Sequence, residues 1–257
     1  MERLNVNYHT HTYRCNHASG KDEDYVIKAI NAGIKVLGFS DHTPRFFKSG
    51  HISGFRMRAE LAKDYFDSIR MLREKYKDEI DVKAGVEAEY YENDPGYFDY
   101  IDEFQPDYII QGQHFIISEE SGRGAARPTR DEKDLADYYL CLYKGIDSKR
   151  FFYIAHPDMI NFTGDDRIFI KHTEEFLRYA KEHKTLLEIN RLGLFENRHY
   201  PRELFWELCG RTGCKAVIGL DAHNPAVFDD TRTMTKCIEY AKKHNVILAG
   251  EDELIIP

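Results

Sequence analysis

Apolar and polar positions alternate along the chain in two ways, and each predicts one kind of element. Seven short runs are dense in apolar residues, which is typical of buried strands. They occupy residues 3–9, 35–42, 81–87, 107–114, 151–157, 185–190 and 216–223. Between them, apolar residues recur every three or four positions, as on one face of a helix. These helical stretches cover residues 21–33, 58–78, 132–146, 167–183, 201–212 and 230–244. Strand and helix alternation predicts a parallel sheet with helical crossovers, which seven or eight units would close into a barrel.

Length and composition agree with one barrel of this kind. A chain of 257 residues is within the range of a single α/β barrel, so we expect one domain spanning 1–257. No apolar run approaches the about 18 residues of a membrane helix, and no basic segment followed by an apolar one opens the chain. Five scattered cysteines indicate reduced thiols, so we expect a cytoplasmic protein with no membrane partner. The formal net charge of −8 disfavours long nucleic acid and favours a small substrate.

Side chains that bind metal ions follow almost every predicted strand. The stretch NYHTHTYRCNH places three of the twelve histidines within residues 7–17, and later strands end in histidine, carboxylate or asparagine. The complete set is His9, His11, His17, Asp41, His42, Glu87, His114, His156, Asn190, Asp221 and His223. In a parallel barrel all these strand ends lie on one face, where the active sites of barrels are built. We therefore expect these side chains to be neighbours in space.

The mixture of imidazoles and carboxylates indicates a particular kind of metal site. One histidine at a strand end is more often structural than a ligand, but this many at independent strand ends is improbable by chance. Nitrogen ligands favour zinc, iron or manganese over calcium and magnesium. Without Asp41 and Asn190, the set leaves nine candidate metal ligands. Nine are too many for one tetrahedral ion, so several ions are expected. Two ions sharing Glu87 would hold a bridging water, lower its pKa towards neutrality and neutralise an anionic substrate.

The order and spacing of these motifs resemble a known family. The segments HTHT, GFSDHTP, GVEAEY, QGQHF, AHPD, LEIN and GLDAH, spread over residues 7–223, resemble the PHP (polymerase and histidinol phosphatase) superfamily. The segments GFRMRAEL and GVEAEYY and the overall length are similar to the stand-alone histidinol-phosphate phosphatases of that superfamily. The resemblance implies a distorted seven-stranded (β/α) barrel. The chain departs from the family pattern at residues 111–113 and 191–201.

The resemblance also implies three divalent ions, which would be zinc, manganese or iron. The first ion would be held by His9, His11, Glu87 and Asp221. Glu87 would bridge to a second ion, held also by His114 and His156. The third ion would be held by His17, His42 and His223.

The activity implied by the resemblance is hydrolysis of a small phosphate monoester. The specific expectation is conversion of L-histidinol phosphate to L-histidinol and phosphate, a step of histidine biosynthesis. A hydroxide bridging the metals would attack phosphorus in line, with Glu87, Asp221 and His223 as catalytic residues. The proton for the leaving alcohol could come from Asp221, from a nearby histidine or from metal-bound water.

Phosphate recognition also needs cationic groups on the same face. Arginine forks pair well with phosphate oxygens, so arginines in the loops after the strands are candidates. The expected substrate contacts are Arg191 and Arg198 after the sixth strand, Arg45 and Arg56 after the second, and Asn190. Each arginine has an alternative interpretation as a solvated loop charge.

Two other functions remain compatible with the sequence. One is a phosphodiesterase or exonuclease acting on short nucleotides with the same metal cluster. The other is a non-catalytic barrel whose metals only stabilise the fold. Structural zinc sites are typically closed, four-coordinate and rich in cysteine, and no cysteine is among the nine candidates, which argues against the second alternative.

Overall fold

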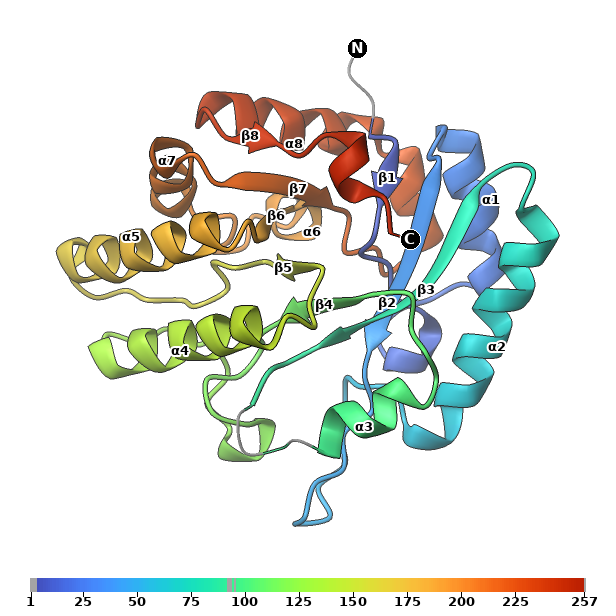
Figure 1. Ribbon diagram of the computed structural model, residues 1–257, viewed down its shortest axis with the longest axis horizontal. Coiled ribbons are helices and arrows are strands. Elements are labelled where there is room, and N and C mark those ends of the chain that lie inside the picture. The colour runs from blue at the N-terminus through green and yellow to red at the C-terminus, as the bar shows by residue number, and fades with distance from the viewer. Residues whose placement is uncertain (1–3, 92–93, 95, 257) are drawn as a thin grey trace.

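Eight parallel strands form one curved sheet in which strands adjacent in sequence are adjacent in space (Figure 1). The computed structural model describes residues 4–91, 94 and 96–256. The strands are β1 (Val6–Asn7), β2 (Val36–His42), β3 (Asp81–Ala88), β4 (Ile109–Gly112), β5 (Tyr153–Ala155), β6 (Leu186–Asn190), β7 (Lys215–Gly219) and β8 (Ile247–Leu248). The prediction of seven strands was therefore short by one. The extra strand β8 pairs with the start of β7 and has only two residues, too few to show a period in the sequence.

The segments that follow β1 and β7 meet directly. Thr10 and Ala222 form a parallel bridge. His11 N donates to Ala222 O at 2.9 Å, and Ala222 N donates to His9 O at 3.1 Å. The sheet thus curls until residues near position 10 lie beside residues near position 222, which places His9, His11 and Asp221 together.

Helices surround the outside of the curved sheet (Figure 1). They are α1 (Asp22–Ala32), α2 (Ala59–Tyr76), α3 (Gly96–Asp102), α4 (Glu132–Ser148), α5 (Asp166–Glu182), α6 (Arg191–Phe195), α7 (Glu203–Thr212) and α8 (Thr231–Lys243). Asp131, Asp165 and Asp230 cap α4, α5 and α8 by accepting a backbone N–H of the first turn. The six predicted helices are present, whereas α3 and α6, with seven and five residues, were missed. Among the described residues, no helix combines the length and apolar character needed to cross a lipid bilayer.

Apolar side chains fill both faces of the sheet. Between helices and sheet lie one layer around Trp206 and Phe176 and another around Tyr65 and Ile69. The inside of the sheet is filled by three buried tyrosines, Tyr8, Tyr108 and Tyr153, packed with Leu254 and Ile256. Tyr108 Oη donates to the carbonyls of Tyr8 and Phe39 at 2.8 Å, and Tyr8 Oη donates to Leu254 O at 2.6 Å. The interior is thus packed, and the chemistry is confined to the strand ends.

Candidate metal centre

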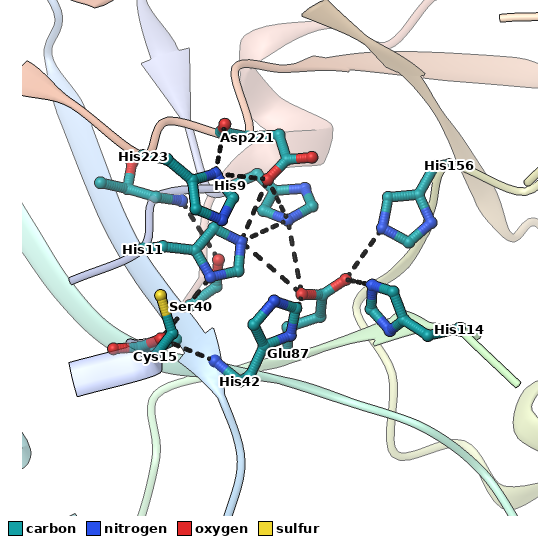
Figure 2. Close-up of polar contacts among 12 residues, drawn as sticks. His9, His11, Cys15, Ser40, His42, Glu87, His114, His156, Asp221 and His223 are labelled. Atoms are coloured by element: carbon teal, nitrogen blue, oxygen red, sulfur yellow. Dashed lines mark hydrogen bonds and ion pairs between the residues drawn. The ribbon is translucent and has the colours of Figure 1, made fainter. Parts of the chain in front are cut away.

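Figure 2 shows the predicted ligands gathered around Glu87. The side chains of His114 and His156 approach Glu87 from one side, and His9, His11 and Asp221 lie on the other. His42, the last residue of β2, lies alongside because β2 and β3 pair with His42 opposite Glu87. All nine predicted ligands come from the C-terminal ends of strands or the segments directly after them. The structure therefore brings together the set that the sequence predicted.

The carboxylate of Glu87 divides the cluster in two. Oε1 lies 2.9 Å from His156 Nε2 and 3.6 Å from His114 Nε2. Oε2 lies 2.8 Å from His42 Nδ1, 3.6 Å from His11 Nε2 and 3.7 Å from His9 Nε2. Each oxygen faces a different group of imidazoles, which is the arrangement of a carboxylate that bridges two cations.

The remaining donors form two further groups. His9 Nε2 and His11 Nε2 are 3.1 Å apart and lie 3.4 and 3.1 Å from Asp221 Oδ1. His17 Nε2 and His223 Nε2 are 2.9 Å apart. One donor atom from each member of the trio His17, His42 and His223 lies within 4.8 Å of the others, and the same holds for His9, His11 and Asp221.

The chemistry of this donor set fits divalent metal ions. Burial holds the pKa of His42 well below its ordinary value and lowers the pKa of His223 to about 3, so both imidazoles keep a free lone pair at neutral pH. Burial alone would raise the pKa of Glu87, but neighbouring imidazoles, among them that of His9, and a hydrogen bond with His156 hold this pKa well below its ordinary value, so the carboxyl stays ionised. Glu87 Oε2 and His42 Nδ1 are 2.8 Å apart and buried, yet neither atom makes a hydrogen bond within the described residues. Converging imidazoles around an ionised carboxylate match the preferences of zinc, iron and manganese.

Cys15 lies beside the cluster, although sequence reasoning left every cysteine out of the site. Its Sγ is within 4.8 Å of one nitrogen of His11 and one of His223. Burial, together with the charge of Asp41, raises the pKa of the Cys15 thiol. A protonated thiol is a poor ligand, so Cys15 is a neighbour of the donor set rather than an equal member of it.

A buried carboxylate that was not predicted, Glu188, orients the imidazole of His9. Glu188, in the middle of β6, lies 2.7 Å from His9 Nδ1 and accepts from His156 N at 3.0 Å. Because Glu188 holds Nδ1 of His9, the other ring nitrogen, Nε2, faces the cluster. Histidines that bind metal ions are commonly oriented in this way by a carboxylate on the second nitrogen. A Cβ on Gly219 would lie 1.6 Å from Glu188 Oε1, so glycine is required there. The sequence did contain one indication of this role, because Glu188 is a charged residue inside the otherwise apolar strand LLEIN.

Comparison with known proteins places this architecture in a family. Residues 7–192 match the PHP domain model. The chain belongs to the PHP domain family. The probable histidinol-phosphatase of Deinococcus radiodurans is 26% identical over 230 residues, covering 84% of this chain and 85% of that protein. The probable histidinol-phosphatase of Schizosaccharomyces pombe is 23% identical over 250 residues, covering 86% and 81%.

The solved structures give the same fold. Histidinol phosphate phosphatase from Lactococcus lactis subsp. lactis, complexed with zinc, L-histidinol and phosphate, matches with a TM-score of 0.72 at 20% identity and covers 96% of each chain. The family predicted from the sequence motifs is therefore confirmed.

A cleft of about 390 Å³ opens over the cluster of predicted ligands. Seven of its lining residues are predicted ligands: His17, His42, Glu87, His114, His156, Asp221 and His223. The other lining residues are Phe55, Met159, Leu192, Glu196, Arg198 and Tyr200. The Phe55 ring lies 5.0 Å from the ring of His42 and 5.6 Å from that of His114, so it walls the cleft next to the ligands.

Two of the arginines expected to contact substrate are instead engaged with carboxylates of the protein itself. Arg56 is 2% exposed and donates to Glu89 and, at 2.8 Å, to Glu119. Glu89 in turn accepts from His114 N at 3.1 Å, so Arg56 neutralises a carboxylate that holds a predicted ligand. Arg45 donates to Asp94 at 2.8 Å and lies over the ring of Tyr91. The structure does not place Arg45 or Arg56 on the wall of the cleft.

Of the three substrate contacts predicted at the end of β6 and after it, only Arg198 lines the cleft. Arg191 is buried, pairs with Asp230 and stacks on Phe195, so it points away from the cleft. Asn190 donates to Glu188 at 2.9 Å and to Asp221 Oδ2 at 3.2 Å, which makes it a positioning residue for Asp221. Arg198 lines the cleft and is the one predicted arginine placed to meet a ligand there. Sequence distance from a strand end did not reveal which way each guanidinium points.

Proposed function

We propose that this protein hydrolyses a small phosphate monoester and that its substrate is L-histidinol phosphate. The observation that carries the proposal is a buried carboxylate, Glu87, whose two oxygens face separate imidazole groups at the floor of a small cleft. A volume of about 390 Å³ is at the low end of small-molecule sites. The cleft therefore suits a metabolite, and the net charge of −8 disfavours a long polyanion.

The nine donors would hold three divalent ions. His9, His11, Glu87 and Asp221 would hold the first, Glu87, His114 and His156 the second, and His17, His42 and His223 the third. The ions, when bound, would supply an activated water as nucleophile and charge to stabilise the phosphoryl oxygens. The protein's own task is to keep each donor in place and in the right protonation state.

Several residues of the chain perform that task or contact the substrate. Glu188 fixes His9 through Nδ1, and Asn190 fixes Asp221 through Oδ2. Arg198 is placed to donate N–H groups to phosphoryl oxygens from the cleft wall. Asp221 and His223 line the same cleft, but both are proposed ligands and both have pKa values below their ordinary values, so the proton needed at the leaving alcohol oxygen would come from water rather than from either side chain.

The choice of L-histidinol phosphate is supported by the named relatives. The proteins of Deinococcus radiodurans and Schizosaccharomyces pombe are both named probable histidinol-phosphatase, and the Lactococcus lactis structure contains L-histidinol and phosphate. The alternative substrate, a short phosphodiester, would use the same cluster.

The test is phosphate release by protein loaded with zinc or manganese. L-histidinol phosphate is compared with a panel of phosphomonoesters and with bis(p-nitrophenyl) phosphate. A kcat/KM above about 10⁴ M⁻¹s⁻¹ for L-histidinol phosphate, well ahead of the panel, supports the proposal. Preference for the diester would favour the nuclease-like alternative, and inertness towards every ester would favour a structural role. Glu87→Gln should abolish activity, while Glu74→Gln on the exposed face of α2 serves as the matched control.

A further inference from the structure

The cleft contains one carboxylate that the metal cluster does not use. Among the described residues that line it, the carboxylates are Glu87, Asp221 and Glu196, and the first two are among the nine proposed ligands. Glu196 follows α6 and its side chain is 44% exposed, so it is open to a bound molecule. A carboxylate beside a phosphate-binding site repels the phosphate unless something positive lies between them.

Arg198 pairs with Glu196 but engages only one of its two carboxylate oxygens. Its Nε and Nη2 both contact Oε2 of Glu196, at 2.7 and 2.6 Å, and its Nη1 donates to Tyr200 Oη at 2.6 Å. These contacts engage one oxygen of Glu196 and leave Oε1 for another donor. They also fix the guanidinium in the cleft wall, so Glu196 and Arg198 present a negative and a positive group side by side.

This pairing matches a substrate that carries both charges. In a phosphate ester of a primary amino alcohol with the ammonium on the next carbon, the ammonium and the phosphate are separated by two carbons and the ester oxygen. We propose that Glu196 binds the ammonium of such a substrate while Arg198 faces its phosphate, which makes the enzyme selective for amino-alcohol phosphates. The inference rests on the proposed phosphatase function. It extends that function by naming Glu196 as the residue that recognises the amino-alcohol part of the substrate.

The test uses Glu196→Gln and two substrates that differ in charge. For L-histidinol phosphate we expect kcat/KM to fall about 10- to 100-fold, because a charge-assisted hydrogen bond to the ammonium is lost. For p-nitrophenyl phosphate, which has no cation, we expect no fall and a lower KM, because Arg198 is no longer neutralised by Glu196. Glu196→Asp should restore part of the preference for L-histidinol phosphate. Glu207→Gln, an exposed carboxylate on α7, is the control variant.

Metal content and melting temperature of each variant are measured alongside. An equal fall on both substrates would overturn the role of Glu196 while leaving the phosphatase function intact. If the wild-type protein ignores L-histidinol phosphate but hydrolyses phosphoethanolamine, and Glu196→Gln loses that activity selectively, the proposed substrate fails and the role of Glu196 stands. A wild-type enzyme that prefers esters without a cation would overturn both.

Discussion

Gly112, the last residue of β4, lies against the carboxylate of Glu87, and a single methyl group there should disrupt the metal centre. A Cβ added to Gly112 would lie 1.7 Å from Glu87 Oε1, 2.4 Å from Cδ and 2.7 Å from Cγ. Ordinary contact begins near 3.4 Å, so Oε1 must retreat by about 1.7 Å in Gly112→Ala. Oε1 is the oxygen that lies 2.9 Å from His156 Nε2 and 3.6 Å from His114 Nε2.

The displacement of Glu87 Oε1 determines how far the activity of Gly112→Ala should fall. A misplacement of 1 Å in a catalytic constellation costs about 100-fold in rate, so kcat/KM should fall by about that factor or more. Overpacking a buried position costs about 1–3 kcal/mol in the free energy of unfolding. At about 2–4 °C per kcal/mol for a chain of this length, the melting temperature should fall by roughly 2–12 °C. The variant should also bind less metal, because the bridging carboxylate no longer faces both groups of imidazoles.

Three measurements on the same preparation check this reasoning. They are the metal content per chain by elemental analysis, kcat/KM for a phosphomonoester, and the melting temperature. Gly96→Ala at the start of α3 is the matched control, because a Cβ there meets nothing within 4 Å. Full metal content and wild-type kcat/KM in Gly112→Ala would refute the bridging role assigned to Glu87.

Further predictions follow from the same contacts. Arg198→Ala should raise KM for a phosphomonoester several-fold without loss of metal, because Arg198 lines the cleft. Arg191→Ala should leave KM unchanged and lower the melting temperature, because it removes the partner of Asp230. Steady-state kinetics and thermal melts distinguish the two variants, and a raised KM in Arg191→Ala would contradict the structure. Removing the metal with a chelator should lower the melting temperature by roughly 5–11 °C for each site that was held at 100 times its Kd, since such a site adds about 2.7 kcal/mol. The pKa of Glu119, which burial alone would raise, is held below its ordinary value of 4.5 by hydrogen bonds from Arg56 and His51, so its contribution to stability is present above pH 4.5 and is lost as the pH falls through the lowered pKa. Glu119→Gln should therefore flatten the acid side of the stability profile, and an unchanged profile would argue against these hydrogen bonds.

The gathering of the proposed ligands could be predicted from the sequence because their positions depend on topology alone. His42, Glu87 and His156 each end a strand or follow it directly, and parallel pairing brings such positions to one edge whatever the side-chain packing. Their grouping around Glu87 then follows from which strands are neighbours. The same reasoning gave the parallel α/β class and, among the described strands and α-helices, all except β8, α3 and α6.

Side-chain direction could not be predicted in the same way. Arg56 and Arg191 lie close in sequence to the site, yet their guanidinium groups turn to the buried Glu89 and to Asp230. A loop arginine satisfies whichever carboxylate the fold brings near it, and that depends on contacts far apart in the sequence. Glu188 escaped notice for the converse reason: its role depends on His9, which is 179 residues away in the chain.

The junction of Thr10 with Ala222 has a consequence for how the protein is made. His9 and His11 are synthesised well before Asp221 and His223, because Asp221 comes 210 residues after His11, and the cluster needs both groups. A nascent chain that stops before residue 221 already has the imidazoles of the early strands but lacks the carboxylate that unites His9 with His11. Assembly of the complete donor set therefore has to wait until residues 221–223 have been translated and have folded against the segment that follows β1.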